Sequence, residues 1–453
     1  MKLPAYPKYK PSGVEWLPEL PDHWGHVALR WTAHRYSGGT PDKGNDDYWE
    51  DGDIPWLNSG AVNDGYITAP STFITRAGLS SSSAKWIPKD ALVMALAGQG
   101  KTKGMVAQLG IATTCNQSMA AIIPTERLRS RYLYWWLAAN YQNIRNMAGG
   151  EARDGLNLDL LGTIPCPLPS DFEQRAIATL LDRETAKIDT LVAKKMTLVD
   201  RLKEKRTALI SRTVTRGLPP DAARAASLDP HPKLKPSGID WLGDVPAHWR
   251  TLRLKNISPR ISGRLVYQPA QYFDDEGVPF LMGNNITERG IKWDDVKFIP
   301  SQINEIFSQY ALREGDVITV RVGAPGLTCV VPKEADGLNC GSMMIIRRSP
   351  KFDSRWLSIV MNSFLVKTQI DQVQYGAAQE QINITDAVNF QIPTPPLIEQ
   401  AAIAAFASEE TAKLDTLAAQ VQSVIERLQE YRTALITAAV TGKIDVRRAS
   451  ASE

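Results

Sequence analysis

Residues 98–104, GQGKTKG, have the composition of a phosphate-binding loop, in which backbone N–H groups and a lysine hold phosphate oxygens. That loop also needs a glycine three residues before Gly98, where this sequence has Ala95. We therefore do not expect a nucleotide site. The glutamine and the lysines of this stretch are suited instead to a DNA backbone or to base edges, although they would equally serve to solvate a turn.

The five histidines and four cysteines of the chain show no metal-binding or nucleophile pattern. No GxSxG, HExxH or CxxC motif occurs, so the cysteines are expected to be reduced structural thiols. His23 and His248 each precede a tryptophan at equivalent places in the two halves of the chain, which favours a structural role for both. The sequence thus points to binding rather than catalysis.

Two polar, glycine-bearing loops offer donors and acceptors of the kind that read base edges. They are GGEARDGLN from Gly149 and YGAAQEQIN from Tyr375, and each follows a segment expected to be helical. A solvated surface loop explains any single residue equally well, but the paired placement favours a function for the loops. The predicted DNA-contacting residues are Gln99, Lys101, Lys103, Arg153, Asn157, Arg264, Arg321, Gln379, Gln381 and Asn383.

Composition permits such a role without demonstrating it. The chain has 453 residues, 43% of them hydrophobic and 22% charged, which is enough for two or three globular domains. A net charge of +3 is compatible with nucleic-acid binding. No apolar run approaches the roughly 20 residues of a membrane span, and the first residues have no apolar signal core, so we expect a cytoplasmic protein.

An internal repeat is the strongest signal in the sequence. The segment KPSGVEWLPELPDHW, which contains Pro11, returns as KPSGIDWLGDVPAHW, which contains Pro236, at an offset of 225 residues (236 − 11). A second repeated stretch begins EQRAIATLL at Glu173 and EQAAIAAFA at Glu399, and a proline-rich stretch precedes both copies. Each half is thus a tryptophan-containing segment (the Trp segment), a variable middle and a helical tail.

The variable middles have mixed α/β character. DALVMALA and GDVITVRVG read as strands, as do MAAIIP and MMIIRR, whereas SRYLYWWLAANYQNIRNM and SRWLSIVMNSFLVKTQIDQV read as helices. The predicted globular domains are residues 1–168 and 233–395, the helical regions 169–217 and 396–453, and the linker 218–232.

The tails show alternating apolar steps of four and three residues, the spacing of a coiled-coil seam. The alternative, that each helix covers only its own half of the chain, predicts a wider apolar face. The predicted seam residues are Ile177, Leu181, Ile188, Leu191, Leu198, Leu202, Leu209, Ile403, Leu414, Leu417, Val421, Val424, Leu428 and Leu435.

The length of the connection between the tails predicts their direction. A helix from Asp171 to Thr215 is about 65 Å long at 1.5 Å per residue, and the link from Gly217 to Pro232 reaches at most roughly 55 Å. A parallel pair would need that link to travel back along the whole coil. We therefore predict two similar globular domains joined by two long antiparallel coiled-coil helices, with a pseudo-twofold internal repeat.

These motifs resemble the specificity subunit of a Type I restriction-modification system. The resemblance rests on IPxP followed by EQxxIA, on IDTL and RLKEKRTALI in the helical tail, on the repeated KPSGxxWL segment and on the two-copy layout, and it covers essentially the whole chain. It implies that the middles are target recognition domains, each reading one half of a split, asymmetric double-stranded DNA site. Two divergent middles on one chain suit two different half-sites, since a homodimer would serve identical ones.

The resemblance also implies partners that carry the chemistry. They are methyltransferase (modification) subunits, which use S-adenosylmethionine to methylate adenine N6, and ATP-driven restriction subunits that translocate DNA, with ATP and Mg²⁺ bound there. This chain has neither the NPPY-type tetrapeptide nor the FxGxG motif of such a methyltransferase. We therefore expect a non-catalytic DNA-recognition subunit that binds no cofactor of its own.

Three other interpretations stay open. A coiled-coil adaptor that binds proteins through its end domains predicts no salt-dependent affinity for DNA. A self-contained DNA methyltransferase or nuclease predicts turnover by the purified chain with DNA, S-adenosylmethionine and Mg²⁺. A specificity chain of a bifunctional or phage-encoded system is the third.

Overall fold

The computed structural model divides into two compact units. Unit 1 comprises Met1–Met196 and Ser423–Glu453, and unit 2 comprises Thr197–Gln422. Each unit thus holds one variable middle together with part of both helical tails, and the predicted domain limits, which set the tails apart, stay a prediction. The structure describes residues 4–98, 100–147, 155–258, 260–264, 269–374 and 381–447.

Unit 1 contains a five-stranded sheet and a three-stranded sheet. The larger has the order β4-β11-β8-β9-β6 and the smaller β10-β5-β7, in which β10 and β5 run parallel. The strands are β4 (Ala33–Ser37), β5 (Ile54–Leu57), β6 (Tyr66–Ile67), β7 (Thr72–Ile74), β8 (Leu92–Ala95), β9 (Val106–Leu109), β10 (Thr114–Cys115) and β11 (Met119–Pro124).

Unit 2 repeats this arrangement. Its four-stranded sheet has the order β16-β24-β21-β22, and its three-stranded sheet has the order β23-β17-β20, again with one parallel pair. The strands are β16 (Ile261–Arg264), β17 (Val278–Leu281), β20 (Lys297–Ile299), β21 (Val317–Val320), β22 (Thr328–Val330), β23 (Asn339–Cys340) and β24 (Met343–Ile346). The two middles therefore share one mixed α/β fold although their sequences have little in common.

The apolar strands are buried on both faces, which is why they read as continuous apolar runs. Successive side chains of β8 alternate between two cores: Leu92 and Met94 join the core around helix α2 (Ser130–Ala139), whereas Val93 and Ala95 join the core on the other face. Strand β21 alternates in the same way in unit 2.

The other elements complete the repeat. A hairpin and a two-stranded sheet hold the Trp segment in each unit. Their strands are β1 (Tyr9–Val14), β2 (Leu17–Pro21), β3 (Gly25–Ala28) and β12 (Pro165–Leu168) in unit 1, and β13 (Leu234–Pro236), β14 (Asp244–Pro246), β15 (Arg250–Arg253) and β25 (Gln391–Thr394) in unit 2. The shorter helices are α1 (Arg76–Ser80), α3 (Tyr141–Asn146), α4 (Leu158–Thr163), α6 (Pro220–Ala225), α7 (Leu254–Ile257), α8 (Ser301–Ile306), α9 (Ser354–Met361), α10 (Phe364–Gln374) and α11 (Ile384–Ala387).

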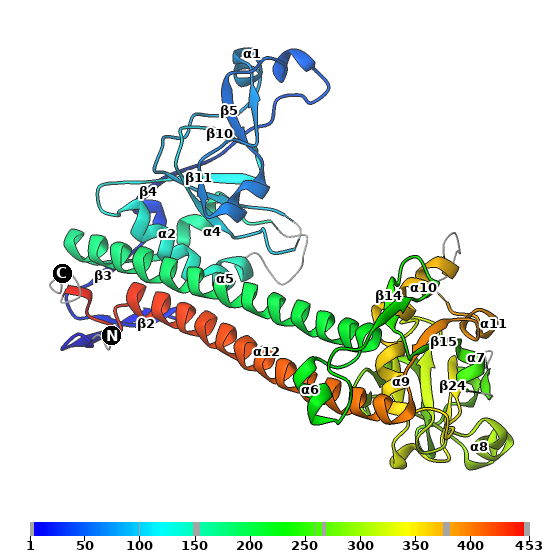
Figure 1. Ribbon diagram of the computed structural model, residues 1–453. Coiled ribbons are helices and arrows are strands. Elements are labelled where there is room, and N and C mark those ends of the chain that lie inside the picture. The colour runs from blue at the N-terminus through cyan, green and yellow to red at the C-terminus, as the bar shows by residue number, and fades with distance from the viewer. Residues whose placement is uncertain are drawn as a thin grey trace. The chain divides into compact units, whose positions relative to one another are not determined.

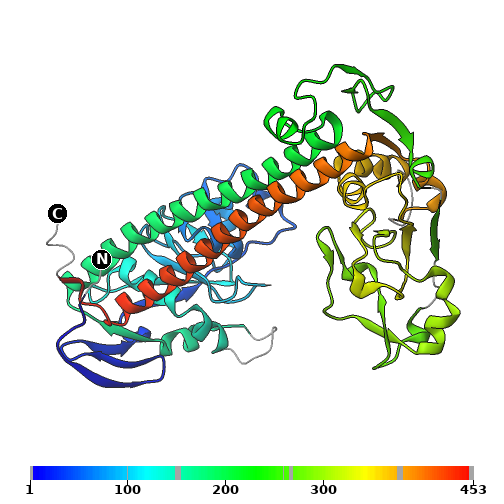
Figure 2. The ribbon, with the colours of Figure 1, turned by 60° about the horizontal axis from the view of Figure 1, so that its bottom comes forward.

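The helical tails are α5 (Asp171–Arg216) and α12 (Leu397–Val440), which lie side by side (Figures 1 and 2). In unit 1, Asp189 near the middle of α5 pairs with Arg432 near the end of α12 at 2.8 Å. In unit 2, Arg206 near the end of α5 pairs with Asp415 of α12 at 3.2 Å. The two ion pairs join repeat-equivalent residues, and their order along the helices makes the pairing antiparallel, as predicted.

The seam of α5 differs from the predicted one at alternate positions. Leu191 and Leu198 are 41% and 37% exposed, whereas their neighbours Val192 and Val199 are partly buried. Leu191 and Val192 are both apolar, as are Leu198 and Val199, so the spacing of four and three residues fits either member of each pair. The prediction from the sequence names the leucines, whereas the valines are the more buried members.

Helix α12 shows the same one-residue shift. Leu417 and Val424 are 44% and 39% exposed, beside the less exposed Ala418 and Ile425. The other predicted seam residues are buried or partly buried: Ile177, Leu181, Ile188, Leu202, Leu209, Ile403, Leu414, Val421, Leu428 and Leu435.

A buried carboxylate fixes the start of α5 to the first Trp segment. Glu173 Oε1 lies 2.8 Å from His23 Nε2 and accepts hydrogen bonds from Tyr6 Oη at 3.0 Å and Trp24 Nε1 at 3.3 Å. Its Oε2 accepts from the backbone N and the hydroxyl of Ser170. Burial alone would raise the pKa of Glu173, but the hydrogen bonds from His23, Ser170 and Trp24 outweigh it and hold the pKa at about 2.

The start of α12 repeats the central part of this arrangement. His248 Nε2 lies 2.8 Å from Glu399 Oε2, so both repeated histidines pair with the glutamate that begins the repeated helix. Ser170 and Glu173 form a capping box, in which each side chain accepts from the other's backbone N–H. Pro396 replaces the serine in the second copy, so Glu399 lacks the serine donors.

Glu173→Gln is expected to lower the free energy of unfolding by about 1.5–3 kcal/mol at pH 7, because several buried donors lose a charged acceptor. The folded-state pKa is depressed, so the contribution is present above the ordinary value of 4.5 and is lost as the pH falls from there towards 2. The difference between the parent and the variant should therefore narrow below about pH 4.5. Denaturant unfolding at several pH values measures it.

Glu399→Gln is the matched control. It removes the equivalent carboxylate where fewer donors meet it, so its cost at pH 7 should be smaller. Equal costs for the two variants would contradict the role given to Ser170 and Tyr6.

Candidate nucleic-acid interface

In unit 1 the predicted lysines lie in the loop that joins β8 to β9. Lys101 is exposed, and its backbone carbonyl accepts a hydrogen bond from Tyr141 Oη of α3 at 2.6 Å. The same hydroxyl accepts from Arg145 Nη1 at 2.9 Å. Lys103 is buried. The loop therefore rests on α3 and presents Lys101 to solvent.

A second segment lies against the base of this loop. Leu156 N donates to Leu96 O at 2.8 Å, which joins the last residues of the first polar loop to the end of β8. Asn157 Oδ1 accepts from Leu160 N at 2.8 Å and so caps α4. Asn157 thus positions the segment, and its amide nitrogen is the part left to contact a ligand.

Unit 2 builds the same junction from different residues. Ile382 N donates to Arg321 O at 2.9 Å, and Gln381 forms a β-bridge with Val322. Arg321 and Ile382 are the repeat equivalents of Leu96 and Leu156, at offsets of 225 and 226 residues. Both units therefore hold the end of an apolar hairpin strand to the last residues of the polar loop.

Arg321 adds a second contact, which has no counterpart at Leu96. Its Nε donates to Ile382 O at 2.8 Å, and its side chain is almost fully buried. Burial lowers the pKa of the guanidinium, yet an arginine stays charged in proteins. Within the described residues it forms no ion pair with a carboxylate, so this edge holds a largely buried positive charge bound to a backbone carbonyl.

The predicted residues are distributed between the two junctions. In unit 1, Lys101 and Lys103 lie in the β8–β9 loop, and Asn157 follows the residue bonded to the end of β8. In unit 2, Gln381 and the exposed Asn383 flank Ile382, which is bonded to Arg321. Arg264 ends strand β16. Gln99, Arg153 and Gln379 lie outside the described residues.

The sequence reasoning missed Tyr141 and Arg145, which support the β8–β9 loop. Their spacing of four residues within the segment expected to be helical was the available signal, because such residues share a helix face. Nothing in the sequence connected that face to the distant lysines.

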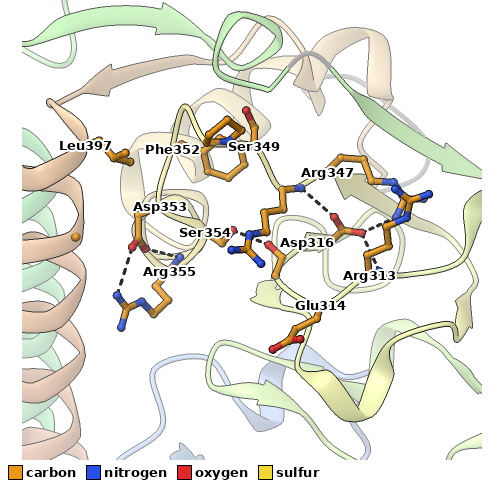
Figure 3. A pocket seen from close by; sticks show the side chains of 14 residues that line it. Arg313, Glu314, Asp316, Arg347, Ser349, Phe352, Asp353, Ser354, Arg355 and Leu397 are labelled. Atoms are coloured by element: carbon orange, nitrogen blue, oxygen red, sulfur yellow. Dashed lines mark hydrogen bonds and ion pairs between the residues drawn. The ribbon is translucent and has the colours of Figure 1, made fainter.

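Unit 2 also has an open cavity of about 820 Å³ between the start of β21 and α9 (Figure 3). Asp316 accepts from Arg347 Nη1 at 2.6 Å and from two backbone N–H groups, and Asp353 pairs with Arg355 at 3.3 Å. Asp316 and Asp353 are thus engaged in holding the chain, and the exposed Glu314 also lines the cavity.

In the described part of the chain, no group of three or more histidine, cysteine, aspartate or glutamate side chains is placed to bind a metal ion. None of its helices combines the length and the apolar character needed to cross a membrane.

The comparisons with known proteins agree with this geometry. Residues 27–198 match the family model for a Type I restriction modification DNA specificity domain. The chain is 29% identical over 151 residues to the Type I restriction enzyme EcoR124I/EcoR124II specificity subunit of Escherichia coli, a match that covers 33% of this chain and 37% of that protein. It is 23% identical over 396 residues to the MjaVIII specificity subunit of Methanocaldococcus jannaschii, over 85% of this chain and 87% of that protein.

One solved structure, described as showing complex assembly and conformational transition of the type I R-M system, superposes with a TM-score of 0.65 at 18% identity. It covers 94% of this chain and 99% of that chain. At 18% sequence identity, this structural similarity supports the assigned fold.

The fold and the matched domain define a DNA specificity protein with two recognition domains of one architecture. The resemblance found in the sequence is confirmed: the chain contains a Type I restriction modification DNA specificity domain and is similar over most of its length to Type I specificity subunits.

Two substitutions separate backbone contact from base reading. Lys101→Ala removes an exposed charge and is expected to weaken binding to all DNA sequences, lowering the slope of log K against log[salt] by about one. Gln381→Ala is expected to cost about 1–3 kcal/mol on the preferred site and to relax the choice at one base pair. Titrations with specific and unrelated DNA over a range of salt concentrations measure both effects.

Lys89→Ala is the matched control, since Lys89 is exposed at the other end of β8. It should leave the salt slope unchanged. The same change of slope in both lysine variants would show that Lys101 makes no specific backbone contact.

Proposed function

We propose that this chain reads a split, asymmetric double-stranded DNA site, with each unit reading one half through the loops at its junction. The observation that carries the proposal is the pair of equivalent junctions, Leu96 with Leu156 and Arg321 with Ile382. The scaffold is the same in both units, whereas the side chains at the edge differ. Such an arrangement supports two different half-sites.

We also propose that the helix pair binds the methyltransferase subunits. The shift of the seam leaves apolar side chains exposed at repeat-equivalent positions, Leu191 with Leu417 and Leu198 with Val424. Tyr431, seven residues after Val424, is also exposed. Exposed apolar side chains at seven-residue spacing are suited to a further helix. Because the helical tail with its exposed apolar residues occurs twice in the chain, it is suited to two copies of one partner.

The chemistry belongs to the partners in this proposal. Methyltransferase subunits with S-adenosylmethionine would modify adenine, and restriction subunits with ATP and Mg²⁺ would act on unmodified DNA. The chain itself would supply recognition and assembly, in the cytoplasm, without a catalytic centre or a cofactor.

Replacing Ala28–Ile164 with the corresponding segment of a related specificity subunit is expected to change one half of the methylated site and leave the other half intact. Ala28 and Ile164 are suitable ends for the replaced segment, because Ala28 pairs with Pro165 where β3 meets β12. The Trp segment before the exchange and the long helix after it are therefore kept. Long-read mapping of methylated adenines in a host with the partner subunits measures the outcome. A change in both halves would contradict one half-site per unit.

Val424→Asp is expected to weaken binding of the methyltransferase subunit about tenfold, because a charge would be buried in the proposed interface. Folding should be retained, since the side chain is exposed in the chain alone. Co-purification and sedimentation with the partner subunit measure the affinity. Gln429→Asp, an exposed position of the same helix, is the control and should leave assembly unchanged.

A further inference from the structure

A network of four charges in unit 2 joins a hairpin of the recognition domain to both long helices. The hairpin consists of β18 (Ile286–Thr287) and β19 (Gly290–Ile291), with Glu288 and Arg289 at its turn. Arg206 Nη2 of α5 lies 2.8 Å from Glu288 Oε2, and Arg289 Nη2 lies 2.6 Å from Asp415 Oδ2 of α12.

The two helix residues are the ion pair that already joins α5 to α12. Arg206 therefore contacts two carboxylates and Asp415 contacts two guanidinium groups, so positive and negative charges alternate through the network. A single exposed ion pair contributes little to stability. Here the hairpin is held at two points, one on each helix, and this restricts its orientation.

The hairpin is rigidly connected to the reading edge. Ile286 is buried in the same core as Ile318 and Val320 of β21, with Ile291 packed against that core. Strand β21 leads directly into Arg321. An apolar core thus links the charge network to the junction proposed to read DNA, and packed cores transmit displacement with little deformation.

Unit 1 has the helix ion pair but shows no hairpin bound to it among its described residues. The equivalent pair, Asp189 and Arg432, is more exposed: the Asp189 side chain is 55% exposed, against 20% for Asp415. In the corresponding chain segment NDG replaces TERG, so that Asp64 takes the place of Glu288 and no arginine follows it. The network is therefore a feature of one recognition domain.

We propose that Glu288 and Arg289 are positioning residues that fix the second recognition domain on the helix pair and thereby set the spacing at which the second half-site is read. This inference rests on the proposed function. The network would thereby restrict the number of base pairs between the two half-sites. A domain that could rotate on its helices would accept half-sites at more than one separation.

The test uses the full chain with its methyltransferase partner. The site is first mapped for the parent protein, and affinities are then measured for duplexes whose gap is one base pair shorter, unchanged or one base pair longer. The double variant Glu288→Ala, Arg289→Ala is expected to lose about threefold to tenfold of the parent's discrimination between gaps. Affinity for the natural gap should change less than threefold, and the half-site letters should stay the same.

Two controls isolate positioning from folding. Arg289→Lys keeps the charge and should retain most of the discrimination, and Asp64→Ala in unit 1 should leave it unchanged. The melting temperature of each variant is recorded, and the double variant should melt within a few degrees of the parent.

The outcomes are distinguishable. Unaltered gap discrimination in a double variant that melts like the parent would overturn the inference alone. Loss of half-site choice together with a large fall in melting temperature would also overturn it, since the residues would then be needed for folding. A parent protein that binds no split site would overturn the proposed function and the inference with it.

Discussion

Each Trp segment must contact the first turn of one long helix and the last turn of the other, and the architecture depends on this constraint. In unit 1, Trp24 donates to Glu173 at the start of α5, while Gly442, just after α12, lies so close to Pro21 that a Cβ would collide with it. In unit 2, Gly217 just after α5 lies near Glu399 and Trp249, which a Cβ would approach to 3.2 and 3.5 Å. Both glycines have a positive φ, which favours glycine in this close approach. Because each segment contacts one helix start and one helix end, the helices have to be antiparallel.

The repeat follows from that constraint. A chain with the same helix junction in both units needs two copies of the Trp segment and of the helical tail. This accounts for the equivalent His23–Glu173 and His248–Glu399 pairs. Between the fixed ends the sequence is free to change, provided that it fills the two cores on either side of β8 or β21. The middles can therefore vary without disturbing the helix junctions.

Much of this organisation could be predicted from the sequence, because it depends on local pattern and on chain length. The repeat, the mixed α/β middles and the antiparallel direction each follow from residues close in the chain or from the reach of the linker. The exact seam could not be predicted, since Leu191 and Val192 are both apolar and only packing in the folded chain separates them. The junction of Arg321 with Ile382 and the network around Glu288 join residues distant in sequence, and no periodicity marks such pairs.

The two copies agree where both units face the same mechanical requirement and differ where they meet different surroundings. Both copies have the interhelical ion pair, the histidine–glutamate pair and the backbone hydrogen bond at the junction. The capping box belongs to the first copy, and the four-charge network belongs to the second. Arg321 occupies the position that Leu96 has in the first unit. The junction common to both units therefore carries a charged side chain in one unit and an apolar side chain in the other. A backbone hydrogen bond places no demand on the side chain, and this separation lets the scaffold stay constant while the chemistry at its edge diverges.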